Sequence, residues 1–485
     1  MSEFLRQAFK TAVERLLTSL LLKLEVALSV IDRKFGAAKL QVRVGDVQKT
    51  GCLRHDAFSG GYWFKIVVTP AMRVRNFRPA GRKGDDYLPL SQSLLFEDVG
   101  DVLQLDEYQD FTAISDRSGL SGADGLGFVL LGLFGEVGSL LSALKKKKRD
   151  KDAYLAYEAA VVEEFGDALW YLANAAGRVG LRLSDLAGRV VASRADWSYH
   201  GQSVVRTFAH LQNTSNHAAS ASTAFEQRLI ELAAKTGGLL DSYGSGRIDN
   251  NRDRLAADLV EVFRALVRAA DDADISLDIA ARRNVAKSEG RWPREKVWGA
   301  SFDESFPAHE QLLRHMVFDF SERTVNGSTF VVLEMNGVNV GDILTDNRPI
   351  EDDYRFHDIF HLAHAAVLGW SPTLRALLKR KRKSNPLIDR NEDGARAILI
   401  EEGISSWIFN HASRAMFYRL TTSLDFDLLK SVRDFAQGYE VEARPMWQWE
   451  VAILEGYRVF RLLKEHRRGR VVVDLDEHTL TFETH

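Results

Sequence analysis

Apolar residues spaced three and four positions apart dominate this chain, which predicts a protein built mainly from amphipathic α-helices. Shorter stretches in which apolar and polar residues alternate predict a few strands. The helical spacing is clearest over residues 3–32, 128–147, 153–179 and 183–197, and the alternation over residues 39–46 and 62–69. Only nine prolines interrupt these patterns. The pattern therefore favours a mainly α protein with small β elements.

Turn signals divide the rest of the chain. The glycine-rich stretch at residues 118–127 is expected to be a loop between helices. Residues 328–341 predict a hairpin, because Asn336-Gly337 is a favoured two-residue turn. A second hairpin is expected over residues 471–482, and the remainder of the C-terminal part is expected to be helical.

Composition narrows the class of protein. A chain of 485 residues is too long for one ordinary core and suggests about two to four domains. The net charge of −3 gives no argument for a nucleic-acid partner. Cys52 is the sole cysteine, which fits a reducing compartment. No signal peptide is recognised, and no apolar run was found to reach the roughly 20 residues that span a bilayer. We therefore expect a cytoplasmic protein without a membrane partner.

The candidate chemistry lies in residues 133–172. Glu136 and Ser139 are three positions apart, as are Glu164 and Asp167, and residues three apart share one face of a helix. Carboxylates at this spacing are common on solvated helix faces. Here their neighbours are apolar, and charges among core residues need a cation or partners. Two such helices side by side would present oxygen ligands suited to Mg²⁺.

Four short motifs resemble the MazG-like all-α nucleotide pyrophosphohydrolases across residues 102–200. They are Glu107-Tyr108-Gln109, Gly135-Glu136-Val137-Gly138, Lys145-Lys146 and the run from Glu164 to Leu172. The resemblance implies an oligomeric helical fold that cleaves a (d)NTP to the monophosphate and pyrophosphate with Mg²⁺, or with Mn²⁺ in its place. It also implies that Glu136, Glu164 and Asp167 are metal ligands.

Ser139 departs from the family pattern, which usually has Glu at this position. A neutral hydroxyl is a poorer ligand for Mg²⁺ than a carboxylate, so activity could be weak, absent or rescued by Glu163. We predict Glu163 and Glu164 as catalytic residues and keep Ser139 as a candidate ligand. Lys145 and Lys148 belong to a basic run that is either a solvated helix end or a clamp for substrate phosphates.

The pattern of motifs seen in residues 102–200 recurs over residues 223–293. The stretch between the two copies, residues 201–222, is expected to be a linker. Lys235 takes the place of Glu136 in this second copy, and a lysine repels a metal ion, so the copy is expected to be non-catalytic. It could instead complete the site of the first copy, as subunits of the family do for each other. Lys287 or Arg291 would then bind a phosphate, or both are surface charges.

A separate domain is expected over residues 300–485, and it resembles the C-terminal domain found in some MazG proteins. His357, His361 and His364 are spaced for one helix face, with Asp358 beside them. Glu401 and Glu402 on a later helix could add carboxylates. This group is either a second metal or acid–base site or a buried polar network that holds the helices in register.

The predicted fold is a tandem all-α NTP-pyrophosphatase helical bundle between two flanking parts. An α+β module of unknown role fills residues 1–98, and the C-terminal domain is mostly helical with short hairpins. The predicted function is Mg²⁺-dependent hydrolysis of a (d)NTP by a homo-oligomer. The alternatives are a degenerate protein that binds or senses nucleotides, and a nucleotide-depleting defence effector with further activity in its C-terminal domain.

Overall fold

The computed structural model describes residues 103–192, 205–212, 219–249 and 251–484, together with three strands nearer the N-terminus. The chain divides into two units, Met1–Leu90 and Ser91–His485. In the first unit, strands occur where the alternation predicted them, and β1 pairs antiparallel with β2 and parallel with β3. The strands are β1 (Ala38–Val44), β2 (Val47–Thr50) and β3 (Tyr62–Val67). The helix predicted over residues 3–32 lies outside the described residues.

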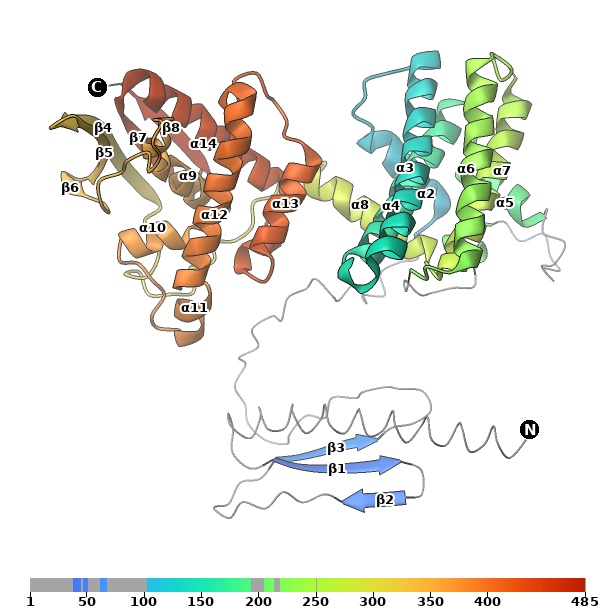
Figure 1. Cartoon of the computed structure of the whole chain (residues 1–485), viewed down its shortest axis with the longest axis horizontal. Helices are drawn as coiled ribbons and strands as arrows, with labels where there is room; N and C mark the ends of the chain where they lie inside the picture. Colours follow the sequence, from blue (N-terminus) through green and yellow to red (C-terminus); the bar gives the residue numbers. More distant parts are fainter. Residues whose placement is uncertain are drawn as a thin grey trace. The chain divides into compact units, whose positions relative to one another are not determined.

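The first half of the second unit is a bundle of helices around one hydrophobic core (Figure 1). Its helices are α2 (Leu105–Ser115), α3 (Gly122–Asp150), α4 (Tyr157–Arg178), α5 (Leu183–Ala192), α6 (Thr223–Gly244), α7 (Arg252–Ala273) and α8 (Leu277–Arg291), with short 3-10 turns η2 (Lys151–Ala153) and η3 (Phe208–His210). The predominance of helix confirms the predicted mainly α fold.

Helix α3 begins earlier than expected. The glycine-rich stretch predicted as a loop forms its first turns from Gly122 onward. Gly125 and Gly127 are tolerated there because their missing side chains admit Arg178 of α4 and Tyr243 of α6, which would collide with a Cβ atom. Close helix packing therefore overrides the helix-breaking tendency of glycine.

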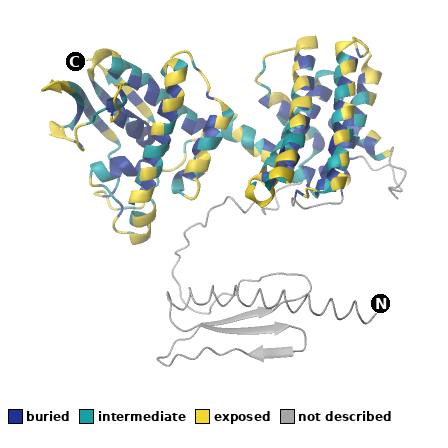
Figure 2. Ribbon diagram, viewed as in Figure 1, coloured by how far each residue is buried: buried dark blue, intermediate teal, exposed yellow. Residues whose placement is uncertain are grey.

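The bundle positions the candidate site through the packing of α3 on α4. Leu133, Val137 and Leu140 of α3 are buried, as are Phe165 and Leu169 of α4. Figure 2 shows such buried positions along the inward faces of the helices and exposed positions along the outward faces. Helix α8 also packs on α4, and α5 packs on α7. The polar residues of α4 therefore meet α3 on one side and α8 on the other.

Two glutamines make the same contacts in the two halves of the bundle. The Gln109 side chain donates to the Leu181 carbonyl and accepts from the Leu183 amide, at 2.8 and 3.0 Å. Gln212 donates to the Ile275 carbonyl and accepts from the Leu277 amide, at 3.0 and 2.7 Å. Each glutamine thereby fixes the start of a helix, α5 or α8.

The stretch expected as a linker, residues 201–222, is described at 205–212 and 219–222, and these parts pack into the bundle. Val205, Phe208 and Leu211 are buried, as is Ala219. The ring of Phe208 meets Tyr108 edge-on with centroids 5.6 Å apart. The polar composition of the stretch concealed these apolar residues, which cover one end of the shared core.

One helix of the described residues, α3 with the turn that follows it to Ala153, has the length and composition to cross a membrane. This finding differs from our expectation that no stretch is apolar enough to span a bilayer. Helices α4 and α6 pack against α3. A core helix of a globular bundle has the same composition.

The C-terminal half combines an antiparallel sheet with helices around a second core. The sheet has the order β6-β5-β4-β7-β8, and all its neighbouring strands are antiparallel. Its strands are β4 (His315–Val325), β5 (Ser328–Met335), β6 (Val338–Asn339), β7 (Arg468–Asp474) and β8 (Thr479–Glu483). Both predicted hairpins are present. The central strand β4 was not predicted, and only its alternation of buried Met316, Phe318 and Phe320 gave a signal.

Helices α9 and α14 pack together and lie against strand β8. The longer helices of this half are α12 (Ala395–Ala412), α13 (Phe426–Ala436) and α14 (Met446–His466), and the shorter ones are α9 (Asp358–Ala363), α10 (Pro372–Leu377) and α11 (Pro386–Asn391). Helix α9 continues as a π-helix, η5 (His364–Leu368). The C-terminal half also contains three short 3-10 turns, η4 (Tyr354–Phe356), η6 (Ser413–Tyr418) and η7 (Glu440–Ala443).

Candidate metal centre

Three predicted carboxylates converge between α3 and α4. Glu136 comes from α3, and Glu164 and Asp167 from consecutive turns of α4. One oxygen of each lies within 4.8 Å of an oxygen of the other two. The side chains are partly buried and set among apolar residues. This arrangement offers a cation three oxygen ligands from two helices.

The pKa values of the three carboxylates are raised, in each case mainly by burial. Burial is the largest cause for Glu164, and a hydrogen bond and repulsion from Glu136 add to it, so that the pKa of Glu164 reaches about 8. Burial also raises the pKa of Glu136 and that of Asp167. Without a cation, Glu136 and Glu164 are therefore held together by a shared proton at neutral pH. Negative charge concentrated in this way favours binding of a divalent cation.

Helix α8 reaches the same group of carboxylates. The Lys287 ammonium donates to Glu163 Oε1 at 3.0 Å and to Asp167 Oδ2 at 2.5 Å. The Asn284 amide donates to Asp167 Oδ1 at 2.7 Å. Tyr108 in turn donates its hydroxyl to Asn284 Oδ1 at 3.1 Å. A chain of hydrogen bonds from α2 through α8 thus fixes the orientation of Asp167.

Glu163 is held by two lysines. Its second oxygen accepts from Lys430 of α13, while Lys287 occupies the first. Burial alone would raise the pKa of Glu163, but the two ammonium groups outweigh it and lower this pKa. Glu163 is therefore ionised while Glu164, its neighbour in sequence, is protonated. Burial alone would lower the pKa of Lys287, and Asp167 and Glu163 raise it instead.

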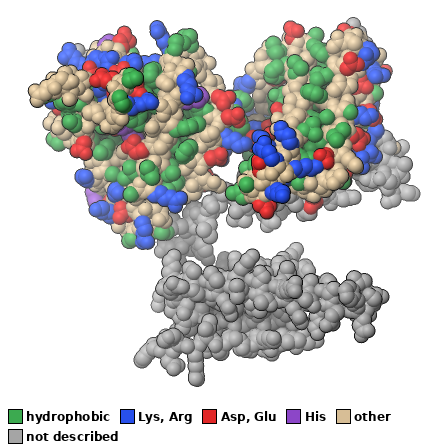
Figure 3. All heavy atoms as spheres, viewed as in Figure 1, with side chains coloured by type: hydrophobic (Ala, Val, Ile, Leu, Met, Phe, Trp, Pro, Cys, Tyr) green, Lys and Arg blue, Asp and Glu red, His purple; other side chains and the backbone are tan. Residues whose placement is uncertain are grey.

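The other predicted site residues lie at varying distances from this centre. Ser139 is half-buried one turn along α3 from Glu136. Lys145 is exposed nine residues from Glu136, which is about 13 Å along a helix. Lys148 is exposed and forms an ion pair with Glu226 of α6 at 2.5 Å. Figure 3 shows Lys and Arg side chains gathered at the end of the bundle where α3 leads into α4. The roles of Ser139 and these lysines stay predictions.

Arg291 points away from the carboxylates. Its guanidinium donates to the Leu424 carbonyl at 2.6 Å and lies over the rings of Trp292 and Phe426. Of the two basic residues considered on α8, the structure brings Lys287 to the carboxylates and places Arg291 against α13 and the segment before it.

At the second, Lys-containing motif, the predicted Lys235 meets Glu261 of α7. Their charged atoms are 3.0 Å apart, and Arg264 holds the other oxygen of Glu261 at 2.5 Å. Glu261 occupies the sequence position that corresponds to Asp167. An ammonium and a guanidinium of the protein therefore neutralise the carboxylate there.

Lys430 and Tyr108 were not predicted to belong to the site. Lys430 lies 267 positions from Glu163 in the sequence, and no local pattern connects them. Tyr108 belonged to one of the motifs behind the family resemblance, and Asn284 lies within residues 223–293, where the pattern recurs. These parts of the sequence were the signals that could have identified Tyr108 and Asn284.

The histidines of the C-terminal half also come together. His357 precedes α9, His361 lies within it, and His364 begins the π-helix, so the three are not on one regular α-helix as expected. Helix α12 supplies Glu401 and Glu402. Two groups of three have ligand atoms within 4.8 Å of one another: His357, His361 and Glu402, and the deeper His361, His364 and Glu401.

The electrostatics of this cluster differ from those of the first centre. Burial alone would lower the pKa of His361, but Glu401 and Glu402 raise it well above the usual range. Burial lowers the pKa of His357 and raises that of Asp358. Burial would raise the pKa of Glu401, yet His361 and His364 hold it far below the usual range. Without a metal, the cluster holds a positive imidazolium between two carboxylates.

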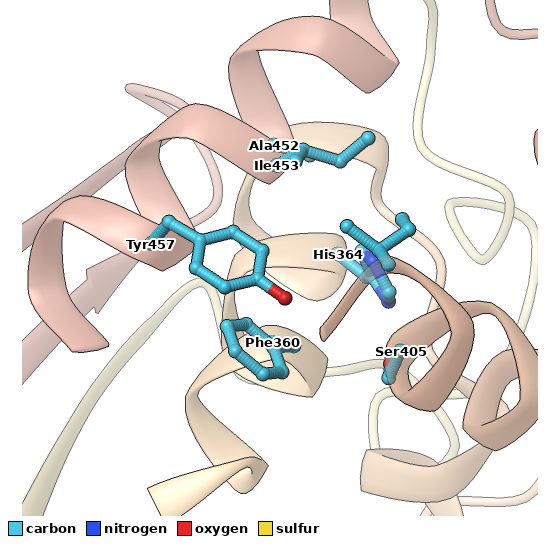
Figure 4. A pocket seen from close by; sticks show the side chains of 7 residues that line it. Phe360, His364, Ser405, Ala452, Ile453 and Tyr457 are labelled. Carbon is cyan, nitrogen blue, oxygen red and sulfur yellow. The ribbon is translucent and has the colours of Figure 1, made fainter. Parts of the chain in front are cut away.

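A small pocket adjoins the deeper end of this cluster (Figure 4). Phe360, His364 and Tyr457 line it together with Ser405. The hydroxyls of Ser405 and Tyr457 are buried without a hydrogen-bond partner among the described residues. The pocket leaves about 10 Å³ for the centre of a water molecule, which is room for about one water. It is too small for a nucleotide.

Comparison with known families identifies the C-terminal half. Residues 298–485 match the MazG C-terminal domain. The chain is also 35% identical over 95 residues to the Gene 37 protein of Mycobacterium phage L5, a match that covers 18% of this chain and 82% of the phage protein. No solved structure matches the chain.

These matches define the class as MazG-related proteins with a mainly helical fold and a MazG C-terminal domain. The chain belongs to the same family as the Gene 37 protein of Mycobacterium phage L5. The predicted relation to MazG proteins is confirmed at this level.

Proposed function

We propose that the protein is a nucleoside triphosphate pyrophosphohydrolase that binds Mg²⁺ on Glu136, Glu164 and Asp167. The observation that carries the proposal is the convergence of these three carboxylates, where burial and the neighbouring Glu136 raise the pKa of Glu164 to about 8. Such a group has the ligand chemistry of a hard cation such as Mg²⁺ or Mn²⁺. Mg²⁺ bound there would neutralise substrate phosphates and lower the pKa of a bound water.

The other residues have distinct proposed roles. Glu163 is ionised beside the metal ligands, so it can accept a hydrogen bond from the attacking water and act as the base. Lys287, with Lys430 behind it, carries positive charge that can stabilise a phosphate in the transition state. Asn284 and Tyr108 keep Asp167 oriented.

We further propose that the bundle is a tandem pair of MazG-like units in which the second completes the site of the first. Gln109 and Gln212 make the same contacts at the starts of α5 and α8. Helix α8 of the second unit brings Lys287 to the carboxylates of the first. Among its described residues the second unit has no corresponding group of three carboxylates, and Lys235 pairs with Glu261 there.

The proposal also includes self-association of the chain. Phe128, Leu131 and Phe134 lie on α3 with 40%, 65% and 43% of their surface exposed. Side chains this apolar, grouped along one helix, are typical of an interface. Analytical ultracentrifugation of the wild type and of Leu131→Lys should show a larger species that only the wild type forms. A monomeric wild type would remove this part of the proposal.

A pyrophosphate-release assay tests the catalytic proposal. Each NTP and dNTP is incubated with the full chain and Mg²⁺, beside Glu164→Gln and the exposed control Glu158→Gln. The wild type and the control should release pyrophosphate from at least one nucleotide, and Glu164→Gln should be at least a hundredfold slower. Equal silence of the wild type and Glu164→Gln would reject the enzyme at this site.

The second candidate function is nucleotide binding or sensing without hydrolysis. The specific observation in its favour is the Lys287 ammonium, 2.5 Å from Asp167 and already neutralising part of the site. Ser139 in place of a fourth carboxylate points the same way. Equilibrium binding of a non-hydrolysable nucleotide with Mg²⁺, together with no pyrophosphate release, would support this function over catalysis.

A further inference from the structure

A second centre of different chemistry lies in the C-terminal half, at His357, His361 and Glu402. The Nε2 atom of His361 lies 3.1 Å from a Glu402 oxygen, and His357 Nε2 lies 3.9 Å from the other oxygen of the same carboxylate. Asp358 contributes an oxygen 3.6 Å from His357 Nε2. Two imidazole nitrogens and carboxylate oxygens therefore face one small volume.

His361 has close neighbours but no aligned hydrogen bond. Its side chain is 1% exposed, and each ring nitrogen has a carboxylate oxygen within 3.1 Å. Neither nitrogen nonetheless makes a hydrogen bond with acceptable geometry among the described residues. A nitrogen and an oxygen about 3 Å apart, but off the N–H direction, have the spacing of two ligands bound to one ion at about 2.0–2.2 Å.

The second nitrogen of each imidazole lies within 3.0 Å of a carbonyl or carboxylate oxygen. His357 Nδ1 lies 2.9 Å from the Tyr354 carbonyl, and the Tyr354 ring stacks on the imidazole. His361 Nδ1 lies 3.0 Å from Glu401, whose other oxygen accepts from the Thr373 amide at 2.9 Å. Metal-binding histidines usually engage a carbonyl or carboxylate with the nitrogen that does not bind the metal. Both Nε2 atoms remain to bind an ion.

The outer group of three is favoured over the deeper group of His361, His364 and Glu401. Glu401 Oε1 already accepts a hydrogen bond from His364 at 3.1 Å, and all three deeper residues are fully buried. The Glu402 side chain is 35% exposed. An ion on the outer group could therefore enter from solvent and keep an open coordination position. A π-helix turn follows immediately, as is frequent at functional sites.

We propose that His357, His361 and Glu402 bind a divalent transition-metal ion, with Asp358 as an available fourth ligand. Imidazole nitrogens with carboxylates are typical ligands of Zn²⁺, Fe²⁺, Ni²⁺ and Cu²⁺, whereas Mg²⁺ prefers oxygen ligands alone. The site is independent of the proposed nucleotide hydrolysis, since it lies in the other hydrophobic core and uses another class of ion.

Metal binding to the full-length chain tests the proposal directly, with Zn²⁺ and Co²⁺ as probes. The protein is stripped with a chelator, and Zn²⁺ binding is measured by calorimetry and by metal analysis after dialysis. Co²⁺ adds a visible absorption spectrum that reports nitrogen ligation. All measurements are made on the Glu164→Gln background, so that the first centre does not contribute and failure of the proposed hydrolase leaves the result unaffected.

Five variants distinguish the two groups of ligands. His357→Ala and Glu402→Gln each remove one proposed ligand and should weaken Zn²⁺ binding at least a hundredfold and abolish the Co²⁺ spectrum. His364→Gln and the exposed control His309→Ala should bind one ion per chain as before. Circular dichroism confirms that each variant is folded. Should His357→Ala misfold, Asp358→Asn replaces it and should weaken Zn²⁺ binding at least tenfold.

Three results would overturn the proposal. The first is a wild type that retains no Zn²⁺ after dialysis. The second is unchanged binding in folded His357→Ala and Glu402→Gln. The third is loss of the metal in His364→Gln with retention in His357→Ala, which would assign the ion to the deeper group.

Discussion

The raised pKa of Glu164 predicts that the metal-free protein loses stability as the pH rises. The folded state keeps a proton on this carboxyl up to about pH 8, whereas the unfolded chain loses it near the ordinary value of 4.5. Between these values the folded state binds more protons than the unfolded state, so the free energy of unfolding falls with rising pH. Stability from this group is present below about pH 4.5 and is lost by about pH 8.

The size of the effect follows from the same two pKa values. Linkage between about pH 5 and pH 8 gives a loss of roughly 3–4 kcal/mol for a shift from 4.5 to about 8. Glu136 and Glu164 are partly open to solvent, which weakens their repulsion. We therefore expect a loss of about 2 kcal/mol to be attributable to Glu164.

Glu164→Gln isolates this contribution, because the amide keeps the shape of the side chain and cannot ionise. Urea unfolding at about pH 5 and pH 8 in the presence of a chelator should show a smaller loss for the variant than for the wild type, by about 2 kcal/mol. Glu158→Gln, an exposed substitution on the same helix, should behave as the wild type. Mg²⁺ at pH 8 should restore stability to the wild type far more than to Glu164→Gln.

Equal loss of stability in the wild type and Glu164→Gln between the two pH values would refute the reasoning. It would mean that burial and Glu136 do not raise the pKa of Glu164 in the folded chain. Failure of Mg²⁺ to stabilise the wild type at pH 8 would separately remove the argument that a cation replaces the shared proton.

Three further predictions concern the surroundings of the carboxylates. Lys287→Met should destabilise the chelator-treated protein by about 2–3 kcal/mol, since it leaves buried carboxylates unpaired. Mg²⁺ should recover most of this lost stability in thermal melts, and a melting temperature equal to that of the wild type would contradict the prediction. Gly166→Ala should loosen α8 from α4 and reduce activity, because the new Cβ would lie 2.6 Å from the Ala280 carbonyl oxygen. Mg²⁺ titrations and pyrophosphate release measure the effect, and values equal to those of the wild type would reject the prediction. Ser139→Glu should tighten Mg²⁺ binding about tenfold in calorimetry if Ser139 faces the ion, since an added ligand that contributes about 1.4 kcal/mol changes the affinity tenfold. Unchanged affinity would place Ser139 outside the site.

Local sequence signals predicted most of the helices and one half of the candidate site. The three-residue spacing of Glu164 and Asp167 on a helix with apolar neighbours was sufficient to place both on one face. Glu136 joined them because its own helix buries Leu133, Val137 and Leu140 along the face that packs on α4. These are short-range regularities, and the structure keeps them.

The remaining features depend on contacts between distant residues. Lys430 meets Glu163 from another part of the chain, and β4 becomes a central strand only through its pairing with β5 and β7. Residues 205–212 lie in a stretch of polar composition but contain apolar side chains that are buried in the bundle. Spacing along a sequence does not report such tertiary packing, which overrides local propensity.

The contribution of α8 to the carboxylate centre has a consequence for how the site depends on protein concentration. A site shared between separate subunits dissociates on dilution, because its assembly is bimolecular. Here Lys287 and Asp167 belong to one polypeptide, and the effective concentration of one for the other is fixed by the fold. The centre should therefore remain assembled at concentrations where any association between chains is lost. The specific activity of a dilute solution would then match that of a concentrated one.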